Sequence, residues 1–139
     1  MLVPDWMINE KRYAVSRTVA EFYCTISMLP LLFVGLYWST TFPLGGSLCI
    51  AAAFASAIYH AMPYKWLLRL DQLCAALLII YALASFDSSL WIFYVIPLLL
   101  LCIDTSCRYF NLFRIPFIHP IWHLCGALCV HMIISSWEG

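Results

Sequence analysis

A long stretch without any charged side chain is the feature of this sequence that most restricts its fold. No Asp, Glu, Lys or Arg occurs between Glu21 and Lys65. That stretch accommodates two helices of about 20 residues, the length that crosses the apolar core of a bilayer. Charged residues make up 10% of the chain and apolar residues 65%, whereas soluble domains carry about 25% charged residues. The sequence therefore predicts an all-α integral membrane protein with a single domain over residues 1–139.

Five apolar segments follow a polar N-terminal segment at residues 1–18. They cover residues 19–38, 46–63, 67–86, 88–104 and 116–136. Pro30 predicts a kink in the first segment, because proline lacks the backbone N–H that an unbroken helix needs. The second segment is rich in small residues, which favour close packing between membrane helices. We expect a bundle of about five transmembrane helices.

The basic residues all fall on one side of a five-helix bundle. They precede the first span, flank the turn between the second and third, and lie between the last two: Lys11, Arg12, Arg17, Lys65, Arg69, Arg108 and Arg114. Basic loop residues are enriched on the cytoplasmic side of membranes. We therefore expect this side to be cytoplasmic, in the endoplasmic reticulum, the Golgi or a bacterial inner membrane. No basic run interleaved with aromatic residues indicates nucleic acid as a partner.

Five residues capable of chemistry come to the same basic side. Two of them end the second span, one opens the third, and two open the last: Ser56, His60, Asp71, His119 and His123. Ionisable side chains inside membrane segments are costly, so they indicate a functional site. The pattern predicts a polar cluster at one depth of an otherwise apolar protein.

The histidine spacing indicates a metal site. His119 and His123 are four residues apart, so both imidazoles project from one face of a helix. His60 from a neighbouring helix would be a third nitrogen ligand, and three protein ligands with one open position is the usual arrangement of catalytic zinc. Zinc lowers the pKa of water towards about 7. Asp71 is then the candidate general base, and Ser56 a candidate hydrogen-bond donor to the water, the carboxylate or an oxyanion.

Other interpretations of the same residues remain open. The histidines can be hydrogen-bonded packing residues, and Asp71 can pair with Arg69 or Lys65. His60 and His123 on separate helices can be the axial ligands of a haem. The cysteines lie mostly inside apolar segments, where they are typical small packing residues. The corresponding functions are a lipid-binding or receptor-like protein with structural zinc, a bis-His haem protein, and a structural subunit of a membrane complex.

The motif S-A-I-Y-H, with an Asp eleven residues later in L-L-R-L-D-Q-L, resembles the alkaline ceramidases and their wider CREST superfamily. The family pattern is a Ser and a His on the second helix, an Asp on the third, and H-x-x-x-H on the last. The five residues that match it in type, order and local spacing are Ser56, His60, Asp71, His119 and His123. The resemblance implies zinc held by the three His, with Asp71 and Ser56 beside the reacting water. It implies hydrolysis of the amide of ceramide, or of a related membrane lipid, to a sphingoid base and a fatty acid. Cleavage of an ester instead of an amide stays open.

A second block, A-E-F-Y-C-T-I-S-M-L-P, resembles the ceramidase branch of that superfamily. That branch binds a structural calcium through an Asp-Trp-x-Glu-x-Asn stretch and a later Glu. The resemblance thus implies calcium ligands at four positions of this chain: Asp5, the Trp6 carbonyl, Glu10 and Glu21. Two departures accompany it, because D-W comes two residues early and Arg12 falls where the family's Asn aligns.

The resemblance covers the first three expected spans and the last, which carry the whole motif. The superfamily usually has seven spans, whereas this sequence shows five. We therefore expect a reduced version of the seven-helix fold. Removing two of seven helices leaves an odd number of spans, so the final helix still enters the membrane from the side of the site.

Overall fold

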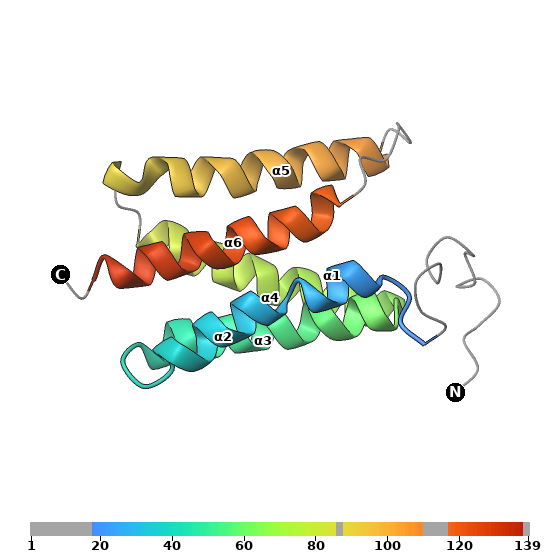
Figure 1. Cartoon of the computed structure of the whole chain (residues 1–139), viewed down its shortest axis with the longest axis horizontal. Helices are drawn as coiled ribbons and strands as arrows, with labels where there is room; N and C mark the ends of the chain where they lie inside the picture. Colours follow the sequence, from blue (N-terminus) through green and yellow to red (C-terminus); the bar gives the residue numbers. More distant parts are fainter. Residues whose placement is uncertain (1–17, 86–87, 110–116, 138–139) are drawn as a thin grey trace.

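The computed structural model describes residues 18–85, 88–109 and 117–137, which form helices and no strand (Figure 1). The elements are α1 (Phe22–Ile26), α2 (Leu29–Trp38), α3 (Pro43–Ala61), α4 (Lys65–Ala84), the short 3-10 helix η2 (Ser88–Leu90), α5 (Trp91–Tyr109) and α6 (Ile118–Ser135). The prediction of an all-α fold is confirmed for these residues.

Four segments in the described part of the chain are long and apolar enough to cross a bilayer. They are α3, α4, the η2–α5 segment Ser88–Ser106, and α6. Large apolar side chains such as Phe33, Trp66 and Ile80 are more than half exposed on the outer surface, as lipid-facing residues are. The structure therefore fits a membrane protein. The first of the five expected spans is shorter, because it is divided between α1 and α2.

The break between α1 and α2 has a local cause. Pro30 lies in the first turn of α2, and it has no N–H to continue the hydrogen-bond ladder of α1. The Ser27 hydroxyl donates instead to the Cys24 carbonyl at 2.8 Å, which satisfies one of the last carbonyls of α1. The kink expected at Pro30 is thus a complete interruption a few residues earlier.

Two other helix bounds differ from the sequence-based expectation. α3 begins at Pro43 rather than at residue 46, because proline is well tolerated at the first position of a helix. α5 continues through Pro97 to Tyr109, well beyond the expected end at residue 104. The second difference matters for the site, because it places Asp104 inside a helix instead of at its end.

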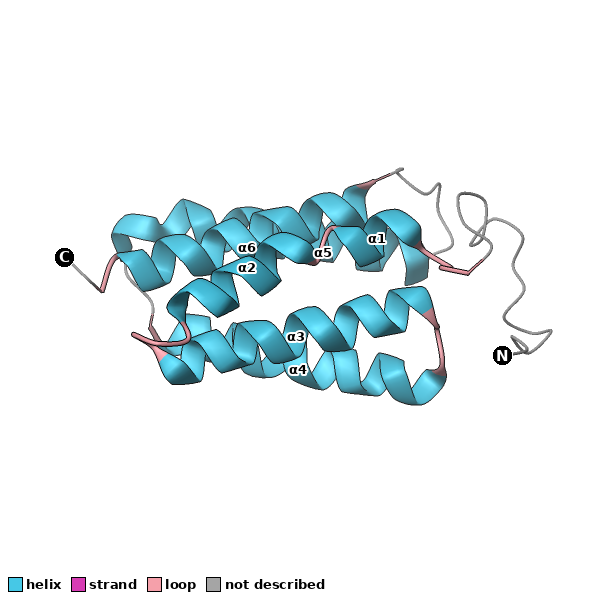
Figure 2. Ribbon diagram, turned by 60° about the horizontal axis from the view of Figure 1, so that its bottom comes forward, coloured by secondary structure: helices cyan, strands magenta, loops and turns pink. Residues whose placement is uncertain are grey.

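The helices form an open arc around a central space. Along the arc, α4 packs on α3, the α1–α2 segment packs on both α3 and α6, and α5 packs on α6. Figures 1 and 2 show these long helices running side by side. In the described part of the chain, α4 and α5 at the two ends of the arc have little direct contact with each other.

Glycines allow α2 and α3 to approach closely. A Cβ on Gly35 would lie 2.9 Å from the Cβ of Cys49 and 2.9 Å from the carbonyl oxygen of Gly46. A Cβ on Gly46 would lie 2.6 Å from the Cα of Ser39. Small residues at such contacts bring helix backbones together in membranes. The small residues of the expected second span therefore form the seam against α2.

We expect the substitution Gly46→Ala to destabilise the protein by about 1–3 kcal/mol, because its methyl group meets backbone atoms that cannot rotate away. Gly126→Ala is the matched control, since no described atom lies within 4 Å of its Cβ and alanine favours a helix over glycine by about 1 kcal/mol. Thermal unfolding in detergent should therefore show a lower midpoint for Gly46→Ala than for Gly126→Ala. Equal midpoints would contradict the seam.

Candidate metal centre

Three histidines from two helices meet at one end of the bundle. His60 lies in the last turn of α3, and His119 and His123 lie in the first two turns of α6. The ring centroids are 4.9 Å apart for His60 and His119, 5.3 Å for His60 and His123, and 4.5 Å for His119 and His123. His60 and His123 are almost completely buried. The structure thus brings together the three histidines that the sequence nominated as ligands.

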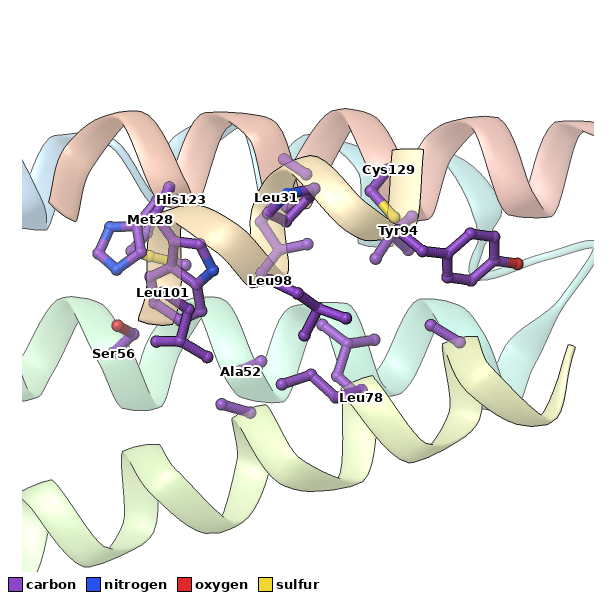
Figure 3. Close-up of a pocket in the computed structure, with 18 of the residues that line it drawn as sticks. Met28, Leu31, Ala52, Ser56, Leu78, Tyr94, Leu98, Leu101, His123 and Cys129 are labelled. Atoms are coloured by element: carbon purple, nitrogen blue, oxygen red, sulfur yellow. The ribbon is translucent and has the colours of Figure 1, made fainter. Parts of the chain in front are cut away.

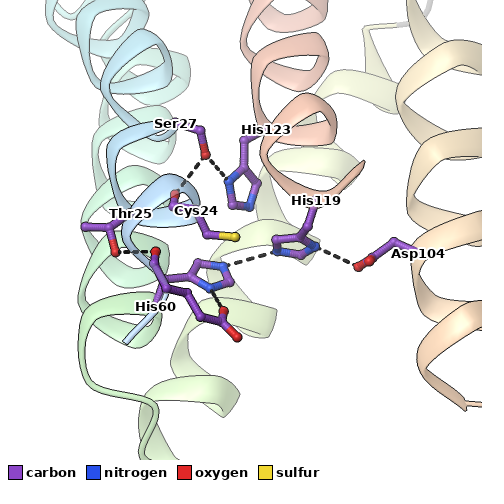
Figure 4. Close-up of polar contacts among 8 residues, drawn as sticks. Cys24, Thr25, Ser27, His60, Asp104, His119 and His123 are labelled. Atoms are coloured by element: carbon purple, nitrogen blue, oxygen red, sulfur yellow. Dashed lines mark hydrogen bonds and ion pairs between the residues drawn. The ribbon is translucent and has the colours of Figure 1, made fainter. Parts of the chain in front are cut away.

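Carboxylates contact two of these rings at Nδ1, the nitrogen that does not face the other ring (Figure 4). Glu21 Oε2 lies 2.5 Å from Nδ1 of His60, and Asp104 Oδ2 lies 2.7 Å from Nδ1 of His119. A carboxylate accepts hydrogen bonds, so each ring donates through its Nδ1–H. In the neutral ring, the lone pair is then on Nε2. The same carboxylate–histidine arrangement orients the ligands of metal sites.

A hydroxyl fixes the third ring in the same way. Ser27 Oγ donates its single proton to the Cys24 carbonyl and also lies 2.7 Å from Nδ1 of His123. Because that proton is already used, Ser27 accepts from His123, which therefore carries its proton on Nδ1. Nε2 of His123, a buried atom, is then the nitrogen with the lone pair.

The two carboxylate-bound rings face each other through their lone-pair nitrogens. Nε2 of His60 and Nε2 of His119 are 3.1 Å apart. Two neutral acceptors at this distance repel, so the arrangement calls for a cation between them, either a metal ion or a shared proton. Two nitrogens on one tetrahedral zinc, each at about 2.0–2.1 Å, lie about 3.3 Å apart. The donor set and its spacing fit a metal ion.

Cys24 of α1 adds a sulfur to this group. One ligand atom from each of Cys24, His60 and His119 lies within 4.8 Å of the others, a spacing that can hold a metal ion. α1 is held against the end of α3 by backbone hydrogen bonds from Ala20 N to Ala61 O at 3.2 Å and from Glu21 N to His60 O at 2.9 Å. These bonds place the α1 side chains beside His60.

Ser56 and Asp71 lie next to the histidines, on α3 and α4. Ser56 is buried one turn before His60, and its side chain interacts with the half-buried carboxyl group of Asp71. Asp71 also interacts electrostatically with His60 and His119. All five residues nominated by the histidine and resemblance arguments are therefore neighbours.

A cavity of about 110 Å³ extends from this cluster along the middle of the arc. Figure 3 shows Ser56 and His123 at its polar end and Tyr94 and Cys129 at its far end. Asp71, which interacts with Ser56, also lines the polar end. Between these ends the wall consists mainly of Ala, Leu, Ile and Val side chains from every long helix. The cavity is partly open, and it lies between α4 and α5, where the arc does not close.

Of the four expected calcium ligands, one lies among the residues that the structure describes. Asp5, Trp6 and Glu10 lie outside the described residues. Glu21 is described, and its carboxylate contacts the imidazole of His60. The calcium assignment therefore stays a prediction, and the structure gives Glu21 a place behind a histidine ring.

The remaining histidine and two of the basic residues are also located. His131 accepts a hydrogen bond from Trp38 Nε1 at 3.1 Å, toward the opposite end of the bundle. Lys65 and Arg69 are exposed in the first two turns of α4, at the same end as His60. The other five basic residues lie outside the described residues or have undescribed side chains, and the assignment of this side to the cytoplasm stays a prediction.

Three residues of the cluster were not nominated from the sequence: Cys24, Ser27 and Asp104. A signal existed for each. Glu21, Cys24 and Ser27 recur every three residues, which places them along one face of a helical turn in a segment that is otherwise apolar. Asp104 is an acidic residue within an apolar run, which indicates a paired functional position. From the sequence alone, this three-residue spacing is equally compatible with a calcium ligand at Glu21 and a packing cysteine at Cys24.

Comparison with known proteins adds no relative to this description. Neither the family models nor the curated proteins nor the solved structures contain a match to this chain. The resemblance to alkaline ceramidases therefore stays a prediction from the motif residues of the sequence.

We expect Glu21→Gln and Asp104→Asn each to weaken the binding of a divalent metal ion, probed with Zn²⁺, by about 10- to 100-fold, because each removes a charged acceptor that fixes a ring through Nδ1. Asp71→Asn is the control, since Asp71 interacts with Ser56 and acts on the imidazoles only electrostatically. Competition with a chromogenic chelator in detergent would measure the affinities. Equal losses in all three variants would show that net charge alone matters and would contradict the orienting role.

Proposed function

We propose that this protein is a zinc-dependent hydrolase within the membrane, and that it cleaves the amide bond of ceramide or a related N-acyl lipid. The observation that carries the proposal is that a polar histidine cluster adjoins an apolar cavity. Oriented imidazoles converge at one end of the bundle, and an apolar cavity begins beside them with Ser56 and Asp71 in its wall. A lipid whose polar linkage lies next to its acyl chain matches such a junction.

The donor chemistry supports the choice of metal. His60 and His119 present lone pairs to one point, and imidazole nitrogens suit zinc and other borderline divalent ions. A third ligand is available from the adjacent side chains, where the family resemblance implies His123. Zinc bound at this point would polarise a carbonyl group and lower the pKa of water towards about 7.

Asp71 and Ser56 would carry the proton and position the reacting groups. The Asp71 carboxylate can accept a proton from the attacking water and return it to the leaving nitrogen. Ser56 interacts with that carboxylate and so helps to orient it. The reaction consumes one water for each amide, and it releases a fatty acid and an amine.

The shape of the cavity supports a lipid substrate. Its wall is apolar apart from the end at Ser56, Asp71 and His123. Its volume of about 110 Å³ is below the roughly 300–1,000 Å³ of pockets that enclose a small-molecule ligand. A substrate would therefore be enclosed only near its reactive linkage, with the remaining chain leaving between α4 and α5 into the bilayer.

We expect purified protein to contain about one zinc per chain and to release fatty acid from N-acyl lipids. His60→Ala combined with His119→Ala should remove both the zinc and the activity, because both ligands are lost. Asp71→Asn should retain zinc and lose most turnover, by about 10²- to 10⁴-fold for removal of a general base. Mass spectrometry for metal and release of labelled fatty acid are the two measurements.

His131→Gln is the matched control, because His131 is the described histidine outside the cluster and is bonded to Trp38. It should retain zinc and activity. Metal with no turnover of amide or ester lipids would favour the non-catalytic, receptor-like alternative. A Soret absorption band in the preparation would favour the haem protein, and a well-folded protein without metal would overturn the proposal.

A further inference from the structure

The sulfur of Cys24 lies on the metal-facing side of α1. It belongs to the group of ligand atoms within 4.8 Å of one another that includes His60 and His119. Figure 4 shows the sulfur directed toward the space between these two rings. Cys24 is half-buried there, at a position where the sequence alone suggests a packing cysteine.

One side-chain hydrogen bond and two backbone hydrogen bonds keep Cys24 in this position. Its carbonyl accepts from Ser27 Oγ at 2.8 Å. The preceding turn is tied to α3 through Glu21 N and His60 O at 2.9 Å, and the α1 turn closes through Thr25 N and Glu21 O at 2.9 Å. The Cα of Cys24 is therefore fixed relative to His60, and rotation about a single side-chain torsion sets the position of the sulfur.

His123 occupies a different place from the other two histidines. It lines the cavity together with Ser56 and Asp71, whereas Cys24, His60 and His119 are not among the described residues that line it. It also falls outside the group of ligand atoms that includes Cys24. Its Nδ1 is held by Ser27 rather than by a carboxylate. The cluster thus has a metal-facing part and a cavity-facing part.

We infer that Cys24, and not His123, is the third metal ligand, so that the centre is a mixed site of one thiolate and two imidazoles. The inference rests on the metal centre proposed above and changes its ligand set. Three protein ligands still leave one open position, as in the catalytic zinc sites that combine cysteine and histidine. His123 is then a polar residue of the substrate cavity.

The thiolate also defines the class of metal. Soft sulfur ligands favour zinc, cobalt and copper over manganese and magnesium, which prefer oxygen. Glu21 and Asp104 supply further negative charge behind the two imidazoles. The site is therefore suited to a borderline divalent cation such as Zn²⁺ or Co²⁺, with Mn²⁺ and Mg²⁺ binding weakly.

The direct test is the absorption spectrum of the full chain in detergent, loaded with Co²⁺. A thiolate ligand gives an intense sulfur-to-cobalt charge-transfer band in the near ultraviolet, which a site of three imidazoles lacks. The wild-type protein should show this band, and Cys24→Ser should lose it. Cys102→Ser is the matched control, because Cys102 is exposed on α5, and it should keep the band. His123→Ala should also keep it.

A second measurement needs no variant and so does not depend on the folding of Cys24→Ser. Zn²⁺ should strongly slow the alkylation of Cys24 in the wild-type protein, because the free thiolate is the reacting nucleophile and the bound metal occupies it. A chelator should abolish the protection. Peptide mapping by mass spectrometry assigns the modified cysteine, with Cys102 as the internal reference.

The inference is overturned if Co²⁺ binds without the charge-transfer band, or if Cys24 is alkylated equally fast with and without Zn²⁺. It is also overturned if His123→Ala loses the metal while Cys24→Ser retains it. These results can be distinguished from those that test the proposed function. A thiolate band in a protein that hydrolyses no lipid supports Cys24 as a ligand and contradicts the hydrolase. Lipid hydrolysis without the band supports the hydrolase and contradicts Cys24 as a ligand.

Discussion

The hydrogen bonds behind the imidazole rings are the interactions on which the site depends. Glu21, Asp104 and Ser27 each occupy an Nδ1, and each comes from a different part of the chain from the ring that it holds. Because Nδ1 is occupied, the lone pair of each neutral ring is on Nε2, toward the cluster. Buried polar groups are costly without partners, so these bonds also make it possible to place three histidines inside an apolar bundle.

The arc of helices explains why such a cluster has a cavity beside it. The α1–α2 segment lies between α3 and α6 and brings Glu21, Cys24 and Ser27 to histidines on both of those helices. α4 and α5 then extend the arc on each side without closing it. The polar cluster is therefore at one end of the space inside the arc, and the apolar walls continue toward the opposite end. The break near Pro30 allows α1 to lie against α3 independently of the direction of α2.

The sequence was sufficient for the helical class and for the convergence of Ser56, His60, Asp71, His119 and His123, because alternating spans bring their ends to one side. It was insufficient where partners depend on helix length or on side-chain direction. Asp104 reaches His119 because α5 continues past residue 104, and an apolar pattern does not fix where a helix ends. Glu21 and Ser27 resemble ordinary residues of a helix start until the position of α1 against α3 is known. The division of the first span a few residues before Pro30 likewise depends on how the backbone around Ser27 is bonded.

The distribution of the cluster over the helices has a consequence for the whole bundle. α2 and α3 are locked together by glycines, and α4 packs on α3, whereas His119, His123 and Asp104 belong to the α5–α6 pair. A cation held by His60 and His119 would join these two halves as a cross-link. Ligand binding to the folded state alone stabilises it, by about 2.7 kcal/mol at a free concentration one hundred times the dissociation constant. The supply of metal would then govern the free energy of unfolding of the protein as well as the occupancy of its site.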